Sequence, residues 1–209
     1  MSLILDPKKI EERSFQIIDG LISSSRLSGQ KKEVIRRVIH ATTDLDYAKG
    51  LIFHPQAIAS GLEAIRGGSD IICDVSMVSS GINAKRLSGF GGKVICFIND
   101  KRVISKSSQL KLSRAVLAMR KAARLMNGAI IAIGNAPTAL FEVCNLVKAG
   151  NMKPALIIGI PVGFVGAAES KKELRSLGIP YITNSGTKGG SSVAAAITNA
   201  LLKMSREKE

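Results

Sequence analysis

The 209-residue chain contains no tryptophan, and only 4% of its residues are aromatic. Proteins that bind single-stranded nucleic acid use aromatic side chains to stack bases, so this scarcity argues against that function. No run of 18 apolar residues is free of polar breaks, which argues against a membrane-spanning helix and a membrane partner. The opening Met1-Ser2-Leu3 resembles a cloning remnant, and no basic segment followed by a long apolar stretch appears. We therefore expect a cytoplasmic protein without a secretory signal.

Cysteine and histidine are also scarce. Cys73, Cys96 and Cys144 have no C-x-x-C spacing and lie among aliphatic residues, which predicts free buried thiols in a reducing cytosol. The sequence has neither an H-E-x-x-H motif nor a Ser-His-Asp order of a hydrolase. Metal-dependent hydrolysis and triad chemistry therefore lack support, and we predict no metal site.

Charge is abundant and mostly of one sign. Thirty basic residues against 16 acidic ones give a net charge of +14, which attracts anions over long range. Nucleic acid, an anionic membrane surface or an acidic metabolite would each fit, and solubility alone is a further explanation. The basic residues are dispersed in pairs such as Lys31-Lys32 and Lys171-Lys172 and form no tail. This dispersal favours a compact acidic ligand over a long polymer.

The first third of the chain predicts three helices. A helix over 7–24 is capped by Asp6, with Pro7 at its first position, and a second over 29–42 is capped by Ser28. A third helix is predicted over 55–66. Helical spacing predicts the buried faces of the first two. These are Ile10, Ile17, Ile18 and Leu21 in the first helix, and Val34, Val38, Ala41 and Leu45 in the second.

From residue 70 onward, short apolar runs alternate with helical stretches. The predicted strands are 71–75, 93–98, 129–133, 155–160 and 181–183, and the predicted helices are 108–126, 137–149, 167–177 and 190–205. Apolar strands separated by amphipathic helices favour an α/β fold with a parallel sheet covered on both faces. Without an internal repeat or a break in composition, we expect one domain over 1–209.

Three of the predicted strands are followed by loops of small residues, at 134–138, 161–168 and 184–191. Ligands of such sheets bind beyond the carboxyl ends of the strands, and helix N-termini attract anions. We therefore predict a shared anion site along this edge. Tight strand-to-helix turns also need glycine for geometry alone, so each loop taken singly is weak evidence.

The two histidines differ in their surroundings. His54 precedes a proline and is predicted to be a loop or cap residue. His40 projects away from the predicted apolar face, with Arg36 and Arg37 one turn before it and Asp44 one turn after. Such neighbours suit a group that donates a proton near neutral pH, although a solvated polar helix face explains the spacing equally well.

Several segments, spread over nearly the whole chain, match a known pattern: 12–15, 37–48, 73–78, 81–82, 132–140, 159–170, 189–191 and 194–201. The string Pro161-Val-Gly-Phe-Val-Gly-Ala-Ala-Glu-Ser170 is highly specific. With these segments the chain resembles the precorrin-8X (cobalt-precorrin-8) methylmutases of cobalamin biosynthesis. The resemblance implies a three-layer α/β/α fold with a mostly parallel central sheet. It also implies a cofactor-free isomerase that moves a methyl group from carbon 11 to carbon 12 of a polycarboxylated tetrapyrrole.

The resemblance further implies a homodimer whose active site is shared between subunits. His40 would protonate the macrocycle, and Ser14 and Arg37 would contact it. Ser14 also falls inside an apolar stripe, where a serine often bonds back to the carbonyl one turn earlier. The full predicted substrate-binding set is Arg13, Ser14, Arg36, Arg37, Asp44, Met77, Arg114, Asn135, Gly163, Lys188, Gly189, Gly190 and Ser191.

One loop departs from the family pattern. Family members commonly have arginines just before the Gly-Gly-Ser turn, whereas this chain has Ser185 and Thr187, with Lys188 as the nearest cation. Lysine lacks the bidentate fork of arginine, so we expect Lys188 to supply only part of that carboxylate binding. Two alternatives stay open: a non-catalytic carrier of the corrinoid product, and a basic nucleic-acid-binding module.

Overall fold

The chain folds around a six-stranded sheet in the order β1-β6-β5-β4-β2-β3. A computed structural model describes residues 5–22, 29–150 and 152–206. The strands are β1 Leu51–Phe53, β2 Ile71–Cys73, β3 Val94–Cys96, β4 Ile130–Ile133, β5 Leu156–Gly159 and β6 Tyr181–Asn184. Neighbouring strands are parallel, except that the edge strand β1 runs antiparallel to β6. The mostly parallel sheet predicted from the sequence is confirmed.

Successive side chains of the buried strands point to opposite faces of the sheet, so each strand contributes to two hydrophobic clusters. In β2, Ile71 and Cys73 belong to one cluster and Ile72 to the other. In β4, Ile130 and Ile131 divide in the same way. Because both faces are buried, these strands are apolar throughout and show no alternation with polar residues.

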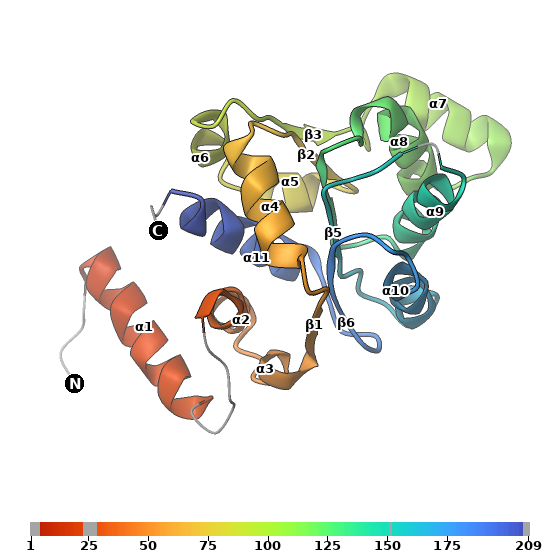
Figure 1. Cartoon of the computed structure of the whole chain (residues 1–209). Helices are drawn as coiled ribbons and strands as arrows, with labels where there is room; N and C mark the ends of the chain where they lie inside the picture. The colour runs from red at the N-terminus through yellow and green to blue at the C-terminus, as the bar shows by residue number, and fades with distance from the viewer. Residues whose placement is uncertain (1–4, 23–28, 151, 207–209) are drawn as a thin grey trace.

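Helices cover both faces of the sheet, which gives the predicted three layers (Figure 1). One layer contains α1 Pro7–Leu21, α2 Gly29–Thr42, α3 Tyr47–Gly50, α4 Ala57–Arg66, α5 Ser76–Gly81, α6 Ala84–Ser88 and α11 Ser191–Met204. The other contains α7 Lys101–Leu110, α8 Arg114–Ala122, the short 3₁₀ helix η1 Ala123–Leu125, α9 Pro137–Lys148 and α10 Ala167–Arg175. In Figure 1 the N-terminal helix α1 lies at the outer side of the first layer, beyond α2.

The predicted helix over 108–126 is wrong. Lys111 adopts a left-handed conformation that ends α7, and Ser113 caps α8 by accepting a hydrogen bond from the Val116 N–H. The chain therefore forms two helices where one was predicted. The predicted caps Asp6 and Pro7 are confirmed at α1, whereas Ser28 lies outside the described residues. Helix α1 ends at Leu21, before the predicted end at residue 24.

The predicted buried faces of the first two helices are partly wrong. In α1, Phe15 and Ile18 are buried, while Ile10, Ile17 and Leu21 are exposed. In α2, the buried residues are Val34, Ile35, Val38 and Ile39, whereas Ala41 and Leu45 are exposed. In α1, tertiary packing buries the side of the helix that contains Phe15 and Ile18. In α2, it buries Val34 and Val38 of the predicted face together with Ile35 and Ile39 beside them. Ile10, Ile17 and Leu21 of α1 therefore form an apolar stripe on the surface of the protein.

Candidate functional site

His40 lies in the last turn of α2, at the edge between core and solvent. Its imidazole packs edge-on against Phe15 of α1, with ring centroids 5.3 Å apart. The guanidinium groups of Arg36 and Arg37 lie over the same phenyl ring at 4.3 and 5.0 Å from its centroid. No residue in the described part of the chain hydrogen-bonds the His40 ring, so its nitrogens are free to meet a ligand.

The two arginines before His40 are held in ion pairs rather than left free. Arg36 bonds both oxygens of Glu33 at 2.8 and 2.7 Å and reaches Asp19 at 3.2 Å. Arg37 bonds Glu11 of α1 at 2.6 Å. Burial opposes ionisation of Glu11, but the hydrogen bond and charge of Arg37 outweigh it and lower the pKa of Glu11. These pairs hold α1 against α2, and an anionic ligand would have to compete with Glu11, Asp19 and Glu33 for the two cations.

Lys188 connects the β6–α11 loop, Ser185–Gly190, to the segment after His40. Its Nζ bonds Asp44 at 2.7 Å and Asp46 at 2.6 Å. The hydrogen bond from Lys188 lowers the pKa of Asp44, and the two carboxylates raise the pKa of Lys188. The β6–α11 loop therefore meets the corner of the molecule where α2, with His40 in its last turn, ends, although 144 positions separate Asp44 from Lys188.

Asp74 ties two of the strand-end loops together. It directly follows β2, is fully buried and accepts three backbone hydrogen bonds, from Gly134 at 3.1 Å, Asn135 at 2.9 Å and Ala136 at 2.7 Å. Burial raises the pKa of Asp74, against the opposing effect of these three N–H groups. The protein's own carboxylate thus occupies the anion-binding N–H groups of the loop after β4. The shared anion site predicted along this edge therefore cannot use these three N–H groups while Asp74 accepts from them.

The other two loops are fastened to each other. The Gly163 N–H donates to Thr187 at 3.1 Å, and the Gly190 N–H donates to the Ile160 carbonyl at 3.0 Å. At Gly189 a side chain would collide with the Ile160 and Pro161 carbonyls, so only glycine allows this approach. Helices α10 and α11 begin at Gly166 and Gly190 without a side-chain cap. A side-chain cap therefore does not occupy either N-terminus, and the anion site at these loops stays a prediction.

The remaining predicted residues are divided between the layers. Ser14 bonds back to the Ile10 carbonyl at 2.8 Å, which is one of the two alternatives set out above, and Arg13 bonds Gln16 at 3.3 Å. Met77 is exposed on α5, in the layer of α2 and α11. Arg114 begins α8 in the opposite layer, and the structure does not bring it to His40. His54 lies in the loop before α4, in line with the predicted loop or cap position, and accepts a hydrogen bond from the Gln56 N–H.

Several functional candidates were missed from the sequence. Phe164 and Val165 are 96% and 88% exposed at the tip of the β5–α10 loop, between Gly163 and Gly166, which both have positive φ. Large apolar side chains flanked by glycines at a strand end are a signal that could have revealed them. Asp74 gave no such signal, because one carboxylate after a strand is common.

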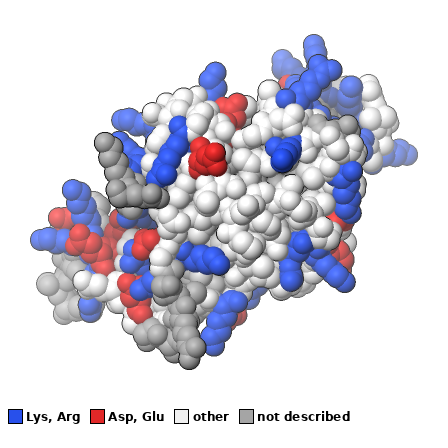
Figure 2. Space-filling view, viewed as in Figure 1, with Lys and Arg blue, Asp and Glu red and all other residues white. Residues whose placement is uncertain are grey.

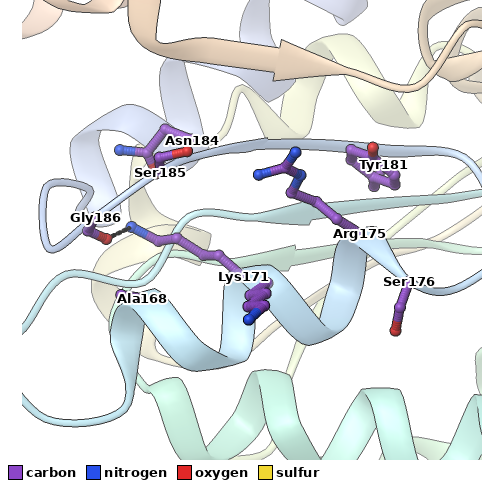
Figure 3. A pocket seen from close by; sticks show the side chains of 9 residues that line it. Ala168, Lys171, Arg175, Ser176, Tyr181, Asn184, Ser185 and Gly186 are labelled. Carbon is purple, nitrogen blue, oxygen red and sulfur yellow. Dashed lines mark hydrogen bonds between the residues drawn. The ribbon is translucent and has the colours of Figure 1, made fainter.

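A groove of about 520 Å³ lies between α10 and β6, behind the β6–α11 loop (Figure 3). Its charged lining consists of Lys171, Lys172 and Arg175 from α10. The side chain of Lys171 crosses from α10 to the loop and bonds the Gly186 carbonyl at 2.9 Å. Burial lowers the pKa of Lys171 to about 8. The sequence gave no reason to single out this lysine among thirty basic residues.

The basic residues are dispersed over the visible surface (Figure 2). They mix with acidic residues over α1 and α2 but dominate over α7, and the segment 101–124 contains neither Asp nor Glu.

Within the described ranges, no three His, Cys, Asp or Glu side chains are grouped as metal ligands. None of the described helices is long and apolar enough to cross a membrane. Cys73 and Cys144 are buried free thiols as predicted, whereas Cys96 is only half-buried.

Comparison with known proteins settles the family. A sequence profile described as CbiC, precorrin-8X methylmutase, matches residues 9–204. This chain belongs to the precorrin-8X methylmutase family. Because methylmutases are isomerases, family membership makes the chain an isomerase. It favours an enzyme over the carrier and the nucleic-acid-binding module that the sequence left open.

Individual methylmutases agree with this assignment. The chain is 44% identical to a cobalt-precorrin-8 methylmutase from Priestia megaterium, over 95% of this chain and 88% of that protein. It is 46% identical to one from Leptospira interrogans, over 96% and 95% of the two chains. The crystal structure of precorrin-8x methyl mutase from Thermus thermophilus matches with a TM-score of 0.89 at 36% identity. That match covers 95% of this chain and 96% of the Thermus chain.

Proposed function

We propose that this chain moves a methyl group from carbon 11 to carbon 12 of precorrin-8X or its cobalt complex, with His40 as proton donor. The observation that carries this role is the imidazole of His40, which has no hydrogen-bond partner among the described residues and packs against Phe15 close to Arg36 and Arg37. His54 is engaged in a cap, which leaves His40 as the histidine available for proton transfer.

The reaction asks little of the protein beyond placement and one acid. The bond from the methyl group to carbon 11 breaks as the bond to carbon 12 forms, so no atom is gained or lost. Protonation of the ring system by His40 withdraws electrons from carbon 12 and prepares it to accept the methyl group. Loss of the same proton afterwards restores the catalyst. Holding the macrocycle still beside the acid supplies the remaining rate enhancement.

Carboxylate side chains of the substrate need cations or N–H groups around this acid. Lys188 and the uncapped N-terminus of α11, at Gly190 and Ser191, lie on the loop that reaches Asp44. Asp44 and Asp46 keep Lys188 in place in the absence of substrate, and an incoming carboxylate joins or replaces them. Arg13 on α1 and Gly163 on the neighbouring loop would complete the set.

The macrocycle also presents flat apolar surface. Phe164 and Val165 stand almost fully exposed at the same edge of the sheet, and Met77 on α5 is 74% exposed. Isolated chains rarely expose such side chains together at a strand end without a ligand or partner. We assign them to packing against the macrocycle.

We further propose that the chain forms a homodimer with shared active sites. Ile10, Ile17 and Leu21 form an exposed apolar stripe on α1, and the stripe leads to a groove of about 510 Å³ lined by Leu21 and Leu45. Asp46, which pairs with Lys188, lines the same groove. A second copy covering this stripe would therefore reach the corner that holds His40.

Replacing Ile17 by glutamate is expected to convert a dimeric protein into a monomer, because a charge would be buried in the apolar interface. Sedimentation velocity measures the change. Ile104→Glu, at an exposed isoleucine of α7 in the opposite layer, serves as the matched control and should stay dimeric. A wild-type monomer, or an Ile17→Glu protein that remains dimeric, would contradict this interface.

The proposed activity itself is tested with purified protein and precorrin-8X or cobalt-precorrin-8. Methyl migration changes the conjugated system, so the visible absorption spectrum should change with turnover in the absence of any added cofactor. Binding without conversion would support the carrier alternative instead.

A further inference from the structure

Lys171 places a charge in an unusual position for a lysine. The residue is 1% exposed, whereas Lys172 and Arg175 on the same helix are exposed. Its ammonium group bonds the carbonyl oxygens of Gly186 at 2.9 Å and Lys188 at 2.5 Å. Within the described part of the chain it has no carboxylate partner. Both bonds fall on the β6–α11 loop. Figure 3 shows the bond to Gly186.

A buried ammonium without a counter-ion is costly for the fold. Desolvation disfavours the charged form, and burial lowers the pKa of Lys171 accordingly. The charged and titratable groups that line the groove with it are Lys172, Arg175 and Tyr181, none of which is a carboxylate. An apolar side chain of similar length would fill the same space without this cost. We therefore infer that the function of a lysine at this position is to donate hydrogen bonds to the two loop carbonyls.

Those carbonyls belong to the segment that presents Lys188. The Lys188 carbonyl also accepts a hydrogen bond from the Asn184 amide at 2.8 Å, so the side chains of Lys171 and Asn184 both donate to it. In front, the Lys188 ammonium holds Asp44 and Asp46. Gly186 and Gly190 have positive φ, a backbone conformation that most residues disfavour. The loop between them therefore depends on contacts from other residues to keep its conformation.

We propose that Lys171 is a positioning residue, which fixes the backbone of the β6–α11 loop so that Lys188 and the α11 N-terminus meet the substrate's carboxylates. The inference rests on the proposed function for its catalytic consequence. Its structural part, a loop held by a buried ammonium, stands on the contacts alone. Lys171 does not touch the substrate and takes no part in the proton transfer.

The test compares Lys171→Met and Lys171→Ala with the matched control Lys172→Met, which removes the same charge from the exposed neighbour. Amide hydrogen exchange of residues 185–190 reports the loop without any substrate, as does tryptic cleavage after Lys188. We expect both to rise about tenfold in the Lys171 variants, since the loop loses two charge-assisted hydrogen bonds. The Lys172→Met protein should match the wild type.

Steady-state kinetics gives the second readout. A loop that binds substrate and transition state equally should raise KM about tenfold in Lys171→Met and leave kcat within about twofold. Propylammonium replaces the atoms that Lys171→Ala removes, and it should restore both loop protection and KM. Tetramethylammonium has the same charge but no N–H group, and it should restore neither.

Unchanged loop exchange in folded Lys171→Met would overturn the proposal. So would an unfolded Lys171→Met protein together with a Lys171→Ala protein that propylammonium does not restore, because the role would then be structural only. A wild-type protein without methylmutase turnover would refute the proposed function, while the exchange measurements would still decide the role of Lys171 in the loop.

Discussion

Replacement of His40 by alanine is expected to lower the rate of methyl migration by about 10²–10⁴-fold, the usual contribution of a positioned general acid. The imidazole is half-buried, and it packs edge-on against Phe15 without a hydrogen-bond partner among the described residues, so its removal should leave the fold intact. Substrate binding should change little, because the carboxylate contacts lie on other residues. Single-turnover visible absorption measures the rate, and equilibrium titration of the bound macrocycle measures the affinity.

The chain provides its own control for this experiment. His54 packs edge-on against Tyr181 and caps the turn before α4, remote in role from the proposed site. His54→Ala should keep the rate within about twofold, since it removes no group from the reaction. Equal rates for His40→Ala and wild type would show that His40 is not the acid.

Replacement of Asp74 by alanine is expected to have the largest effect on stability. The change leaves three backbone N–H groups, those of Gly134, Asn135 and Ala136, without an acceptor beside a new cavity. The Gly134 N–H is buried and the other two are partly buried. A buried orphan donor costs about 1–3 kcal/mol, so the free energy of unfolding should fall by about 3 kcal/mol in all. Asp74→Asn keeps one acceptor oxygen and should lie between alanine and wild type. Equilibrium unfolding in urea gives these values.

Asp70 is the matched control for Asp74. Its carboxylate accepts one backbone hydrogen bond, from Lys93 at 2.8 Å, near the opposite end of β2. Asp70→Ala should cost about 1 kcal/mol, because solvent can replace an exposed bond. If Asp74→Ala proved no more harmful than Asp70→Ala, the carboxylate would not be what ties the loops together.

The order of strands and helices after residue 70 could be predicted because both faces of the sheet are buried. Four-residue apolar runs such as Ile130–Ile133 then stand out between amphipathic helices. Strand β1 could not be predicted in this way, because it has three residues and exists only through its pairing with β6. The break at Lys111 was missed because the apolar spacing continues on both sides of it.

The site was predictable residue by residue only to a limited extent. The position of His40 outside the core followed from helical spacing, and the structure places it at the solvent edge. The ion pairs of Arg37 with Glu11 and of Lys188 with Asp44 join segments far apart in the sequence, so no local pattern signals them. The same holds for Asp74 and Lys171, whose partners are backbone groups of distant loops.

The most direct test of the central claim follows the methyl group itself. Purified protein is incubated with precorrin-8X or cobalt-precorrin-8 whose methyl group on carbon 11 is labelled with carbon-13, and the product is examined by NMR. The proposed function predicts that the labelled methyl group is found on carbon 12, with wild type and without added cofactor. A label that stays on carbon 11 after prolonged incubation with the folded protein would contradict it.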